Sequence, residues 1–247
     1  MRNMRSVHGV LFDIDETLVD LRTAMANTVR EISAGELGHF SEADWAGYQE
    51  LYAADPLGHY DQYLAGELSF TRQRLNRVAH AQQVHGLPAF DDAAERTWNA
   101  AYERTLPRHF SVYDDVLPLL DHLDARGIPY GAVSNNVHDY QRAKLDAVGL
   151  QRIRVLVGTD TVGVAKPDPA IFLEGIRLLG TEPGNTLYIG DNLRIDAEGA
   201  CAAGLQGIWL DRAGNPSPVR QETGGTADGG EFLTVRSLGE VAELALR

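Results

Sequence analysis

The sequence lacks most of the features that stabilise or anchor a protein by means other than packing. Its 247 residues include a single cysteine, Cys201, which has no partner for an intrachain disulfide. No stretch reaches the roughly 18 consecutive apolar residues of a membrane-spanning helix. The basic N-terminal residues lead into an apolar run that ends at Asp13, too early for a signal peptide. These absences predict a soluble, cytoplasmic protein without a membrane partner.

Positive charge is scarce as well. The chain has 22 Lys and Arg residues against 35 Asp and Glu residues, which gives a formal net charge of −13. Binding to a nucleic-acid polymer irrespective of its sequence requires a basic surface. The composition therefore argues against a nucleic-acid partner and favours a small-molecule ligand.

Short apolar segments alternate with helical patterns along most of the chain. The predicted strands are residues 7–13, 130–134, 153–157, 187–190 and 207–211, and the predicted helices include 116–126, 139–148, 169–179 and 195–203. Strands that are apolar throughout are typical of a parallel sheet covered by helices on both faces. We therefore predict an α/β fold with a doubly wound, Rossmann-like parallel sheet.

Residues 21–108 interrupt this alternation. They show amphipathic helical patterns, one of them after a predicted N-cap at Ser69, and no convincing strand. Most aromatic residues of this segment are expected in the core of a small helical subdomain. We predict an α/β core formed by residues 1–20 and 109–247, with residues 21–108 as an inserted α-helical cap. The polar, glycine-rich residues 213–230 predict a surface loop.

The first predicted strand ends in two aspartates, Asp13 and Asp15. Side chains two residues apart in an extended strand leave on the same side, and open α/β sheets bind ligands at the carboxyl ends of their strands. Two carboxylates so close together repel each other unless a cation or a shared proton compensates. Two aspartates after a strand are also common in turns, so on their own they are weak evidence for a site. Whether they belong to one depends on the residues that follow the other strands.

Three further segments carry complementary groups. Ser134 and Asn135 follow the second strand at an expected helix start, where a hydroxyl and backbone N–H groups favour a phosphate oxygen. Asp191 ends a later strand, where a divalent cation facing Asp13 would find a ligand. Lys166 precedes a helix that begins with proline. The strand ends therefore predict a site for a phosphate and a cation.

The chain has two lysines among its 22 basic residues. Because nearly all basic residues of the chain are arginines, a lysine at the candidate site indicates that a compact ammonium group is needed there. We expect Lys166 to supply this group. The other lysine, Lys144, is expected to be solvated.

Together, the segments DIDET, SNN, KPDP and GDNLRID, in this order, resemble the four motifs of the haloacid dehalogenase superfamily. The insert between the first and second motifs resembles the helical cap of one branch of that superfamily. Within this branch, the stretches DIDETL, VGVAKPDPAIF and LAGELSFTRQRLNR look most like the group of small 5′-nucleotidases and sugar-acid phosphatases.

The resemblance implies a role for each motif residue. Asp13 would attack phosphorus to form an aspartyl phosphate, and Asp15 would protonate the leaving oxygen and then activate water. Mg²⁺ would be bound by Asp13, the backbone carbonyl of Asp15 and Asp191. The phosphoryl oxygens would be held by Thr17, Ser134, the backbone near Asn135 and Lys166. The metal site would be supported by Asn192 and Asp196.

These roles lead to the hypothesis of a Mg²⁺-dependent phosphomonoester hydrolase that acts on a small phosphorylated metabolite, for which a nucleoside 5′-monophosphate is one candidate. A phosphomutase on the same scaffold and a noncatalytic phosphate-ligand binding protein are the alternatives. Dehalogenation is disfavoured because the resembling dehalogenases lack a counterpart of Asp15.

Selectivity among phosphate esters is expected to come from the cap, because the motif residues address only the phosphoryl group. The candidate residues are Tyr48, Tyr52, Tyr60 and Tyr63 and the helix that carries Arg72, Arg74 and Arg77. Most of these arginines are nevertheless expected on a solvated helix face.

Overall fold

Two compact units make up the chain in the computed structural model, which describes residues 6–214 and 232–245. The α/β unit comprises Met1–Val19 and Val112–Arg247, and the helical unit comprises Asp20–Ser111. Among the described residues, no helix combines the length and the apolar character needed to cross a membrane.

The chain passes between the two units twice, at neighbouring points. On the α/β side, Val19 forms an isolated antiparallel bridge with Val112. On the helical side, the backbone N–H of Asp20 donates to the carbonyl of Ser111 at 3.0 Å. The first and last residues of the helical unit are therefore hydrogen-bonded to each other.

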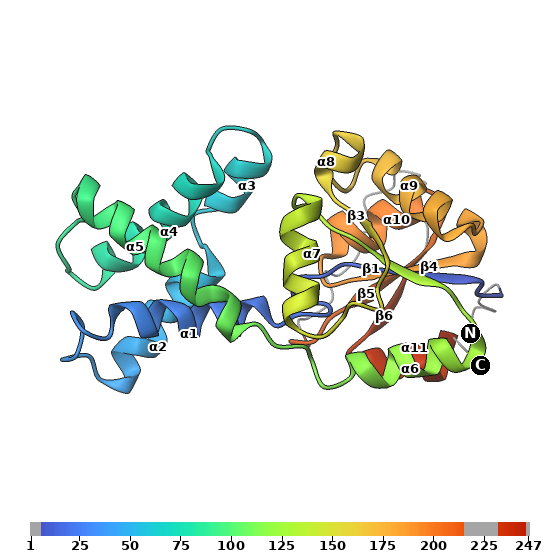
Figure 1. Cartoon of the computed structure of the whole chain (residues 1–247), viewed down its shortest axis with the longest axis horizontal. Coiled ribbons are helices and arrows are strands. Elements are labelled where there is room, and N and C mark those ends of the chain that lie inside the picture. The colour runs from blue at the N-terminus through green and yellow to red at the C-terminus, as the bar shows by residue number, and fades with distance from the viewer. Residues whose placement is uncertain (1–5, 215–231, 246–247) are drawn as a thin grey trace, which may run out of the picture. The chain divides into compact units, whose positions relative to one another are not determined.

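The α/β unit is built on a six-stranded parallel sheet (Figure 1). Its strands are β1 (Gly9–Phe12), β2 (Tyr130–Val133), β3 (Val155–Val157), β4 (Thr186–Gly190), β5 (Gln206–Leu210) and β6 (Leu233–Val235). They lie in the order β3-β2-β1-β4-β5-β6, and the register pairs Phe12 of β1 with Ala132 of β2 and Ile189 of β4. The predicted parallel α/β fold is confirmed.

Strand β6 pairs with β5 at one edge of the sheet and was not predicted from the sequence. A run of three residues is too short to show the period that distinguishes a strand. It follows residues 215–231, which lie outside the described residues together with most of the predicted surface loop.

Helices of the α/β unit cover its sheet. They are α6 (Val116–Arg126), α7 (His138–Ala147), α8 (Thr159–Val162), α9 (Pro169–Leu179), α10 (Gly199–Ala202) and α11 (Leu238–Ala245), with the 3₁₀ turn η2 (Pro183–Asn185) and the π-helical turn η3 (Leu193–Glu198). Helix α6 packs against α11 on one side of the sheet, and α9 and α10 lie on the other side (Figure 1). The helices predicted at 116–126 and 169–179 are confirmed with the same bounds.

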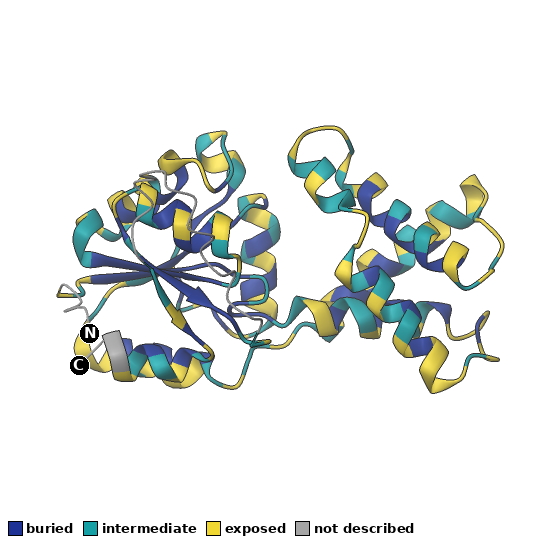
Figure 2. Cartoon of the chain, turned by 180° about the vertical axis from the view of Figure 1, so that it is seen from behind, coloured by how far each residue is buried: buried dark blue, intermediate teal, exposed yellow. Residues whose placement is uncertain are grey.

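Burial on both faces explains why the strands are apolar throughout. Figure 2 shows the sheet as almost entirely buried, and Val10, Leu11 and Phe12 of β1 have no exposed surface. Leu11 packs in one cluster with Phe172 of α9. Fully burying a side chain of this size contributes about 2 kcal/mol. The central strand is therefore a rigid support for the residues that follow it.

The helical unit consists of α1 (Leu21–Ser33), α2 (Glu42–Ala54), α3 (His59–Leu64), α4 (Phe70–Val84) and α5 (Asp92–Thr105), followed by the 3₁₀ turn η1 (Leu106–His109). The predicted N-cap at Ser69 is confirmed, since its side chain accepts a hydrogen bond from the backbone N–H of Arg72 at 3.1 Å. The unit has its own core, which contains the aromatic residues Trp45, Tyr48, Tyr52, Trp98 and Tyr102.

Several residues that were predicted to determine selectivity or to be solvated are buried inside the helical unit. Tyr48 and Tyr52 are each 1% exposed and belong to the core of the helical unit, so they cannot reach a ligand without disrupting that core. Arg74 and Arg77 are buried rather than solvated, because the unit supplies acceptors for their guanidinium groups. Arg72 does lie near the surface, as expected. Tyr60 and Tyr63 are half-buried, and their rings contact each other in a tilted arrangement with centroids 5.7 Å apart.

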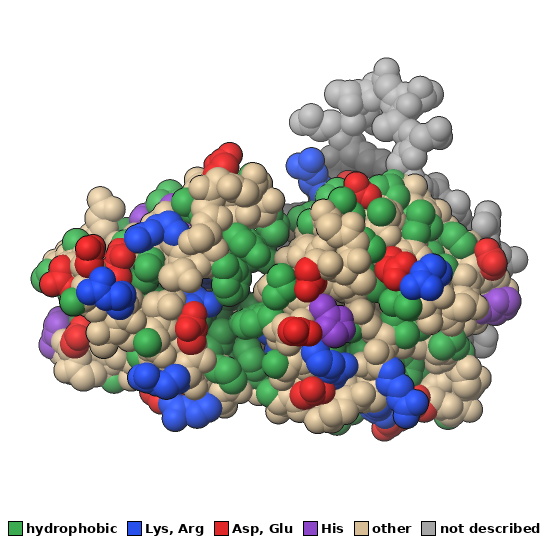
Figure 3. All heavy atoms as spheres, turned by 45° about the horizontal axis from the view of Figure 1, so that its top comes forward, with side chains coloured by type: hydrophobic (Ala, Val, Ile, Leu, Met, Phe, Trp, Pro, Cys, Tyr) green, Lys and Arg blue, Asp and Glu red, His purple; other side chains and the backbone are tan. Residues whose placement is uncertain are grey.

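Charged side chains of both signs are interspersed over the face shown in Figure 3. Ion pairs of the described residues include Arg30 with Glu42 and Arg152 with Asp121. The described residues on this face present no continuous basic tract, in agreement with the acidic composition.

Candidate active site

Three neighbouring strands deliver polar side chains to one edge of the sheet. β2, β1 and β4 are adjacent, and their last residues are followed by Ser134, Asp13 and Asp191. The backbone N–H of Asp13 donates to the carbonyl of Ile189 at 2.8 Å, and that of Ser134 donates to the carbonyl of Val157 at 2.9 Å. Because the strands are parallel, this is the edge at which open α/β sheets bind ligands.

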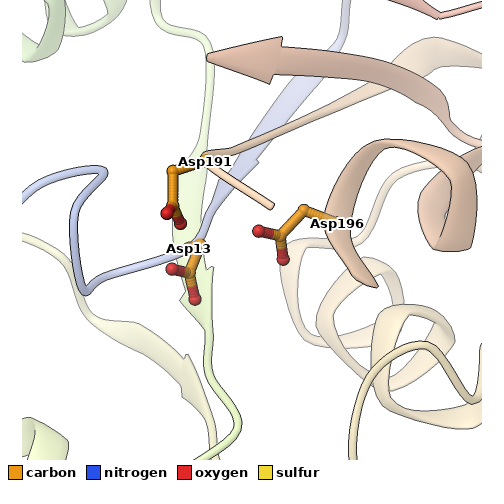
Figure 4. Close-up of side chains that lie close together, drawn as sticks. All are labelled: Asp13, Asp191 and Asp196. Atoms are coloured by element: carbon orange, nitrogen blue, oxygen red, sulfur yellow. The ribbon is translucent and has the colours of Figure 1, made fainter. Parts of the chain in front are cut away.

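The acidic cluster, which we define as Asp13, Asp191 and Asp196, lies at this edge (Figure 4). Each residue offers a carboxylate oxygen within 4.8 Å of the others. Asp13 and Asp191 follow strands, whereas Asp196 comes from η3. Gly190 permits the close approach of Asp196, since a Cβ atom at Gly190 would lie 2.3 Å from the Asp196 Cγ.

Lys166 compensates part of the negative charge of the acidic cluster. Its Nζ donates to the Asp13 Oδ1 at 2.6 Å, to the Asp196 Oδ1 at 2.7 Å and to the Tyr188 hydroxyl at 2.9 Å. An ammonium group has three N–H donors, so each of them has an acceptor. Lys166 is only 5% exposed, and the interior of the α/β unit therefore fixes its position.

Tyr188 is a site residue that the sequence analysis missed. It lies within β4, is fully buried, and its hydroxyl donates to the carbonyl of Val133 at 3.0 Å while accepting from Lys166. The available signal was a tyrosine inside an otherwise apolar strand, because a buried phenol hydroxyl needs a partner.

One ammonium group does not balance three carboxylates. Burial raises the pKa of Asp13 to about 7, and the charges of Asp196 and Asp15 add to this rise while Lys166 opposes it. Burial, Asp13 and Asp196 also hold the pKa of Asp191 well above its usual value. Burial works to lower the pKa of Lys166, but Asp13 and Asp196 outweigh it and keep that pKa well above its usual value. The site therefore keeps its ammonium charged and resists full ionisation of its acids.

The carboxylate oxygens of the acidic cluster suit a hard divalent cation, since such oxygens are preferred ligands of Mg²⁺. Both oxygens of Asp196 accept hydrogen bonds, from the Lys166 Nζ and from the backbone N–H of Asn192 at 3.0 Å. Within the described part of the chain, no hydrogen bond reaches the carboxylate of Asp191. Asp13 and Asp191 thus retain carboxylate oxygens that a cation could bind, whereas both oxygens of Asp196 already accept hydrogen bonds.

Asn192 acts on the cluster through the backbone. It caps η3, where its Oδ1 accepts from the backbone N–H groups of Arg194 at 3.1 Å and Ile195 at 3.0 Å. This cap fixes the start of the turn that carries Asp196.

Hydroxyl groups near Asp13 are available to an anion. Thr17 is completely buried, and its Oγ1 has no hydrogen-bond partner among the described residues. An unpaired buried hydroxyl is destabilising, and a phosphoryl oxygen would satisfy it. The Ser134 Oγ accepts from the Gln141 Nε2 at 2.6 Å, which leaves its own hydrogen to donate.

The side chain of Asn135 binds the backbone of Lys166, while the phosphate contact predicted for Asn135 concerns its backbone. Its Nδ2 donates to the carbonyl of Lys166 at 2.9 Å, and its Oδ1 accepts from the backbone N–H of Lys166 at 2.6 Å. This reciprocal pair holds the backbone of Lys166 in place.

The expectation of a solvated Lys144 is wrong. Lys144 lies in α7, is 2% exposed, and forms an ion pair with the Asp15 Oδ1. Gln141 of the same helix donates from Nε2 to the Asp15 Oδ2 at 3.0 Å. No short-range pattern could reveal this contact, because Lys144 and Asp15 are 129 residues apart.

Known proteins resemble this chain in sequence and in fold. The haloacid dehalogenase-like hydrolase family matches residues 7–204. The glyceraldehyde 3-phosphate phosphatase of Methanopyrus kandleri is 30% identical over 218 residues, which cover 83% of this chain and 84% of that protein. The phosphoglycolate phosphatase of Rhodospirillum rubrum is 31% identical over 219 residues, covering 85% and 82%.

Among solved structures, the magnesium-bound HAD hydrolase YfnB of Bacillus subtilis matches with a TM-score of 0.74 and 20% identity, covering 98% of this chain and 100% of that chain. At this identity the likeness concerns the fold alone. The sequence matches decide the family: the chain belongs to the haloacid dehalogenase-like hydrolases. Within that family it is an enzyme of the phosphatase type.

Proposed function

We propose that the chain is a Mg²⁺-dependent phosphatase that hydrolyses small phosphate monoesters through an aspartyl phosphate on Asp13. The observation that carries this proposal is the arrangement of Asp13, buried between Lys166 and the acid Asp191, at the edge of the sheet where ligands bind. The curated relatives act on small phosphate esters, which supports the same class of substrate here.

The first half of the reaction transfers the phosphoryl group to the enzyme. A carboxylate oxygen of Asp13 attacks phosphorus, the bond from phosphorus to the leaving oxygen breaks, and protonated Asp15 gives its proton to that oxygen. The released alcohol carries this proton away. The Thr17 and Ser134 hydroxyls and the Lys166 ammonium are the donors for the phosphoryl oxygens.

The second half releases inorganic phosphate. The carboxylate of Asp15 takes a proton from water, the water oxygen attacks phosphorus, and the bond from phosphorus to the Asp13 oxygen breaks. Asp13 returns as a carboxylate and Asp15 returns in its protonated form. One ester and one water have then become one alcohol and one phosphate.

Asp13 and Asp191, with the backbone carbonyl of Asp15, are the groups that would hold Mg²⁺, and the bound ion would neutralise the phosphoryl oxygens. The charge of the site calls for such a cation. With Asp15 protonated, as the first half of the reaction requires, ionised Asp13, Asp191 and Asp196 outnumber the ammonium groups of Lys144 and Lys166 by one. A dianionic phosphate would be repelled by this excess.

The test is a screen of phosphate esters with the purified chain, scored by released inorganic phosphate. Phosphoglycolate, glyceraldehyde 3-phosphate and nucleoside 5′-monophosphates belong in it, so that the nucleotide candidate is compared directly with the substrates named for the relatives. Phosphate release with Mg²⁺ and its loss on chelation are expected. Full turnover without metal would remove the metal from the proposal, and a phosphorylated isomer in place of free phosphate would indicate a mutase.

A noncatalytic binding protein would release no phosphate from any ester. The matched control is Asp13→Asn, which keeps the shape of the nucleophile and removes its charge. This variant should bind phosphate esters without hydrolysing them, because an amide is a poor nucleophile. If it hydrolysed them at the original rate, Asp13 would not be the nucleophile.

A further inference from the structure

Both carboxylate oxygens of Asp15 are held by one helix. The Lys144 Nζ donates to Oδ1, and the Gln141 Nε2 donates to Oδ2 at 3.0 Å. Gln141 and Lys144 are three residues apart in α7, so their side chains lie on the same face. A carboxylate held at one oxygen can still rotate about its Cβ–Cγ bond. Donors on both oxygens remove this rotation.

The donors are part of the interior, whereas the acceptor is not. The Lys144 side chain is 1% exposed, while that of Asp15 is 25% exposed. Gln141 has no exposed surface. Asp15 is therefore the partly exposed member of the group, and the fixed positions of Gln141 and Lys144 determine where its carboxylate lies.

Gln141 also connects Asp15 to the phosphate side of the site. Its Nε2 donates to the Ser134 Oγ at 2.6 Å in addition to the Asp15 Oδ2. Ser134 follows β2 and Asp15 follows β1, so this single amide group sets the separation between a phosphate donor and the acid–base residue.

We propose that Lys144 and Gln141 are positioning residues that fix the Asp15 carboxylate for both of its proton transfers. The inference rests on the proposed function, because it gives Asp15 the acid–base role. Proton transfer requires the catalytic group within hydrogen-bond reach of the oxygen it serves, and small displacements lower the rate steeply. Lys144 and Gln141 touch neither the ester nor the water. They act through Asp15.

Removing one partner of an ion pair is strongly destabilising when the remaining charge is fully buried. The Asp15 side chain is 25% exposed, so water can solvate its carboxylate when Lys144 is replaced. Methionine has nearly the length of lysine and would fill the same space. Removal of the charge is therefore expected to affect the position of Asp15 more than the fold.

The experiment compares Lys144→Met and Gln141→Leu with the original chain on two substrates. One is an alkyl phosphate, whose leaving oxygen needs a proton, and the other is p-nitrophenyl phosphate, whose leaving group departs without one. For the alkyl ester, we expect Lys144→Met to lower kcat about 10- to 100-fold. KM should change less than about threefold.

With p-nitrophenyl phosphate, Lys144→Met should release about one molecule of nitrophenol per enzyme molecule in a rapid burst. Slow turnover should follow. The first half of the reaction then proceeds without Asp15, whereas hydrolysis of the aspartyl phosphate still needs it. Gln141→Leu should show the same pattern with a smaller loss in kcat. It should also raise KM, since it releases Ser134.

Arg142→Met is the matched control on the same helix, because Arg142 pairs with Asp146 and reaches no residue of the site. It should leave kcat within about twofold of the original value. A double variant supplies the decisive comparison: in an Asp15→Asn background, Lys144→Met should cause no further loss, because the residue through which it acts is gone.

Three outcomes would overturn the inference: equal losses on both esters without a burst, a kcat for the alkyl ester at or above the original value, or additive losses in the double variant. Each of these is measured against an active original chain. An original chain that hydrolyses neither ester would instead refute the proposed function itself.

Discussion

Both units of the molecule bury positive charge, but they use different residues and different acceptors. In the α/β unit, Lys144 and Lys166 face the carboxylates of Asp15, Asp13 and Asp196. A lysine ammonium is a compact charge that several acids can approach from different directions. The carboxylates it attracts belong to the candidate active site, so this pairing keeps reactive groups in place.

The helical unit buries arginines against carbonyl groups, an amide, aromatic rings and one partly exposed carboxylate. Arg77 donates from Nε and Nη2 to the carbonyl of Tyr52 at 2.8 and 2.6 Å, and its guanidinium lies 4.8 Å from the centre of the Tyr52 ring. Arg74 donates to the Asn99 Oδ1 at 2.7 Å and to the Glu103 Oε1 at 3.1 Å, and it lies over the Tyr102 ring. A planar guanidinium suits carbonyl groups and ring faces. The comparison teaches that the buried lysines hold carboxylates of the candidate site, whereas the buried arginines hold the helices of their own unit together.

The largest expected effect comes from replacing Asp13, whose carboxylate pairs with Lys166. Asp13→Asn should lower kcat about 10⁵-fold, because the nucleophile is lost. It should also raise the Tm of the metal-free protein at pH 8. Ionised Asp13 is destabilising there, since its pKa is raised to about 7 from 3.8. Phosphate release and thermal unfolding measure the two effects, and a lower Tm at pH 8 would contradict the charge argument.

The next effect tests whether Lys166 needs both of its carboxylate partners. In Gly190→Ala, the new Cβ would lie 2.3 Å from the Asp196 Cγ and displace Asp196 from Lys166. We expect activity to fall about 100-fold, and the free energy of unfolding to fall by about 1–3 kcal/mol. Gly35→Ala is the control, because a Cβ at Gly35 meets no atom within 4 Å. Unchanged activity in Gly190→Ala would show that the position of Asp196 is unimportant.

A smaller effect tests the arginine half of the comparison. Arg77→Met should lower the free energy of unfolding by about 2–3 kcal/mol, because it leaves the buried Tyr52 carbonyl without its charged donor. Turnover of p-nitrophenyl phosphate should stay within about threefold at temperatures where the variant is folded.

Arg72→Met is the matched variant on the same helix, since the Arg72 side chain is 48% exposed and pairs with Glu95. Such a pair contributes less than about 1 kcal/mol. Urea denaturation compares the two arginine variants. If both destabilised the protein equally, burial would not explain the role of Arg77.

The smallest effect concerns pH. The pKa of Asp13 is raised to about 7, so the native metal-free protein holds a proton that the unfolded chain releases, and stability falls as pH rises from about 4 to 7. A cation binds the ionised form, so its stabilising effect should grow through the same range. We expect the Mg²⁺-induced increase in Tm to be about 3 °C larger at pH 8 than at pH 6. An increase that is independent of pH would contradict this linkage.

The sequence predicted the elements that repeat a clear pattern. Strands β1 to β5 are continuous apolar runs because both faces of the sheet are covered, and helix α9 begins at Pro169 and ends before Gly180. Positions at strand ends were also accessible, because parallel strands bring their carboxyl ends to one edge. This is how Asp13 and Asp191 could be proposed as neighbours.

Contacts between distant segments were not accessible. Lys144 looked like an ordinary helix residue, since nothing near it in the sequence marks a partner at Asp15. Arg74 and Arg77 looked solvated because arginine is usually exposed, and only the packed helical unit supplies the carbonyl and ring faces that bury them. Burial of a charged group depends on its acceptors, and these come from other parts of the fold.

The hydrogen-bonded junction of Asp20 with Ser111 has a consequence for how this protein can diverge. The chain leaves the α/β unit after Val19 and returns to it at Val112, and these two residues pair with each other. An insertion whose ends already meet can gain, lose or exchange helices without stretching β1 or shifting α6, and lengthening such a loop has only a small entropic effect. Selection can thus change the helices of Asp20–Ser111 while the residues at the sheet edge stay unchanged.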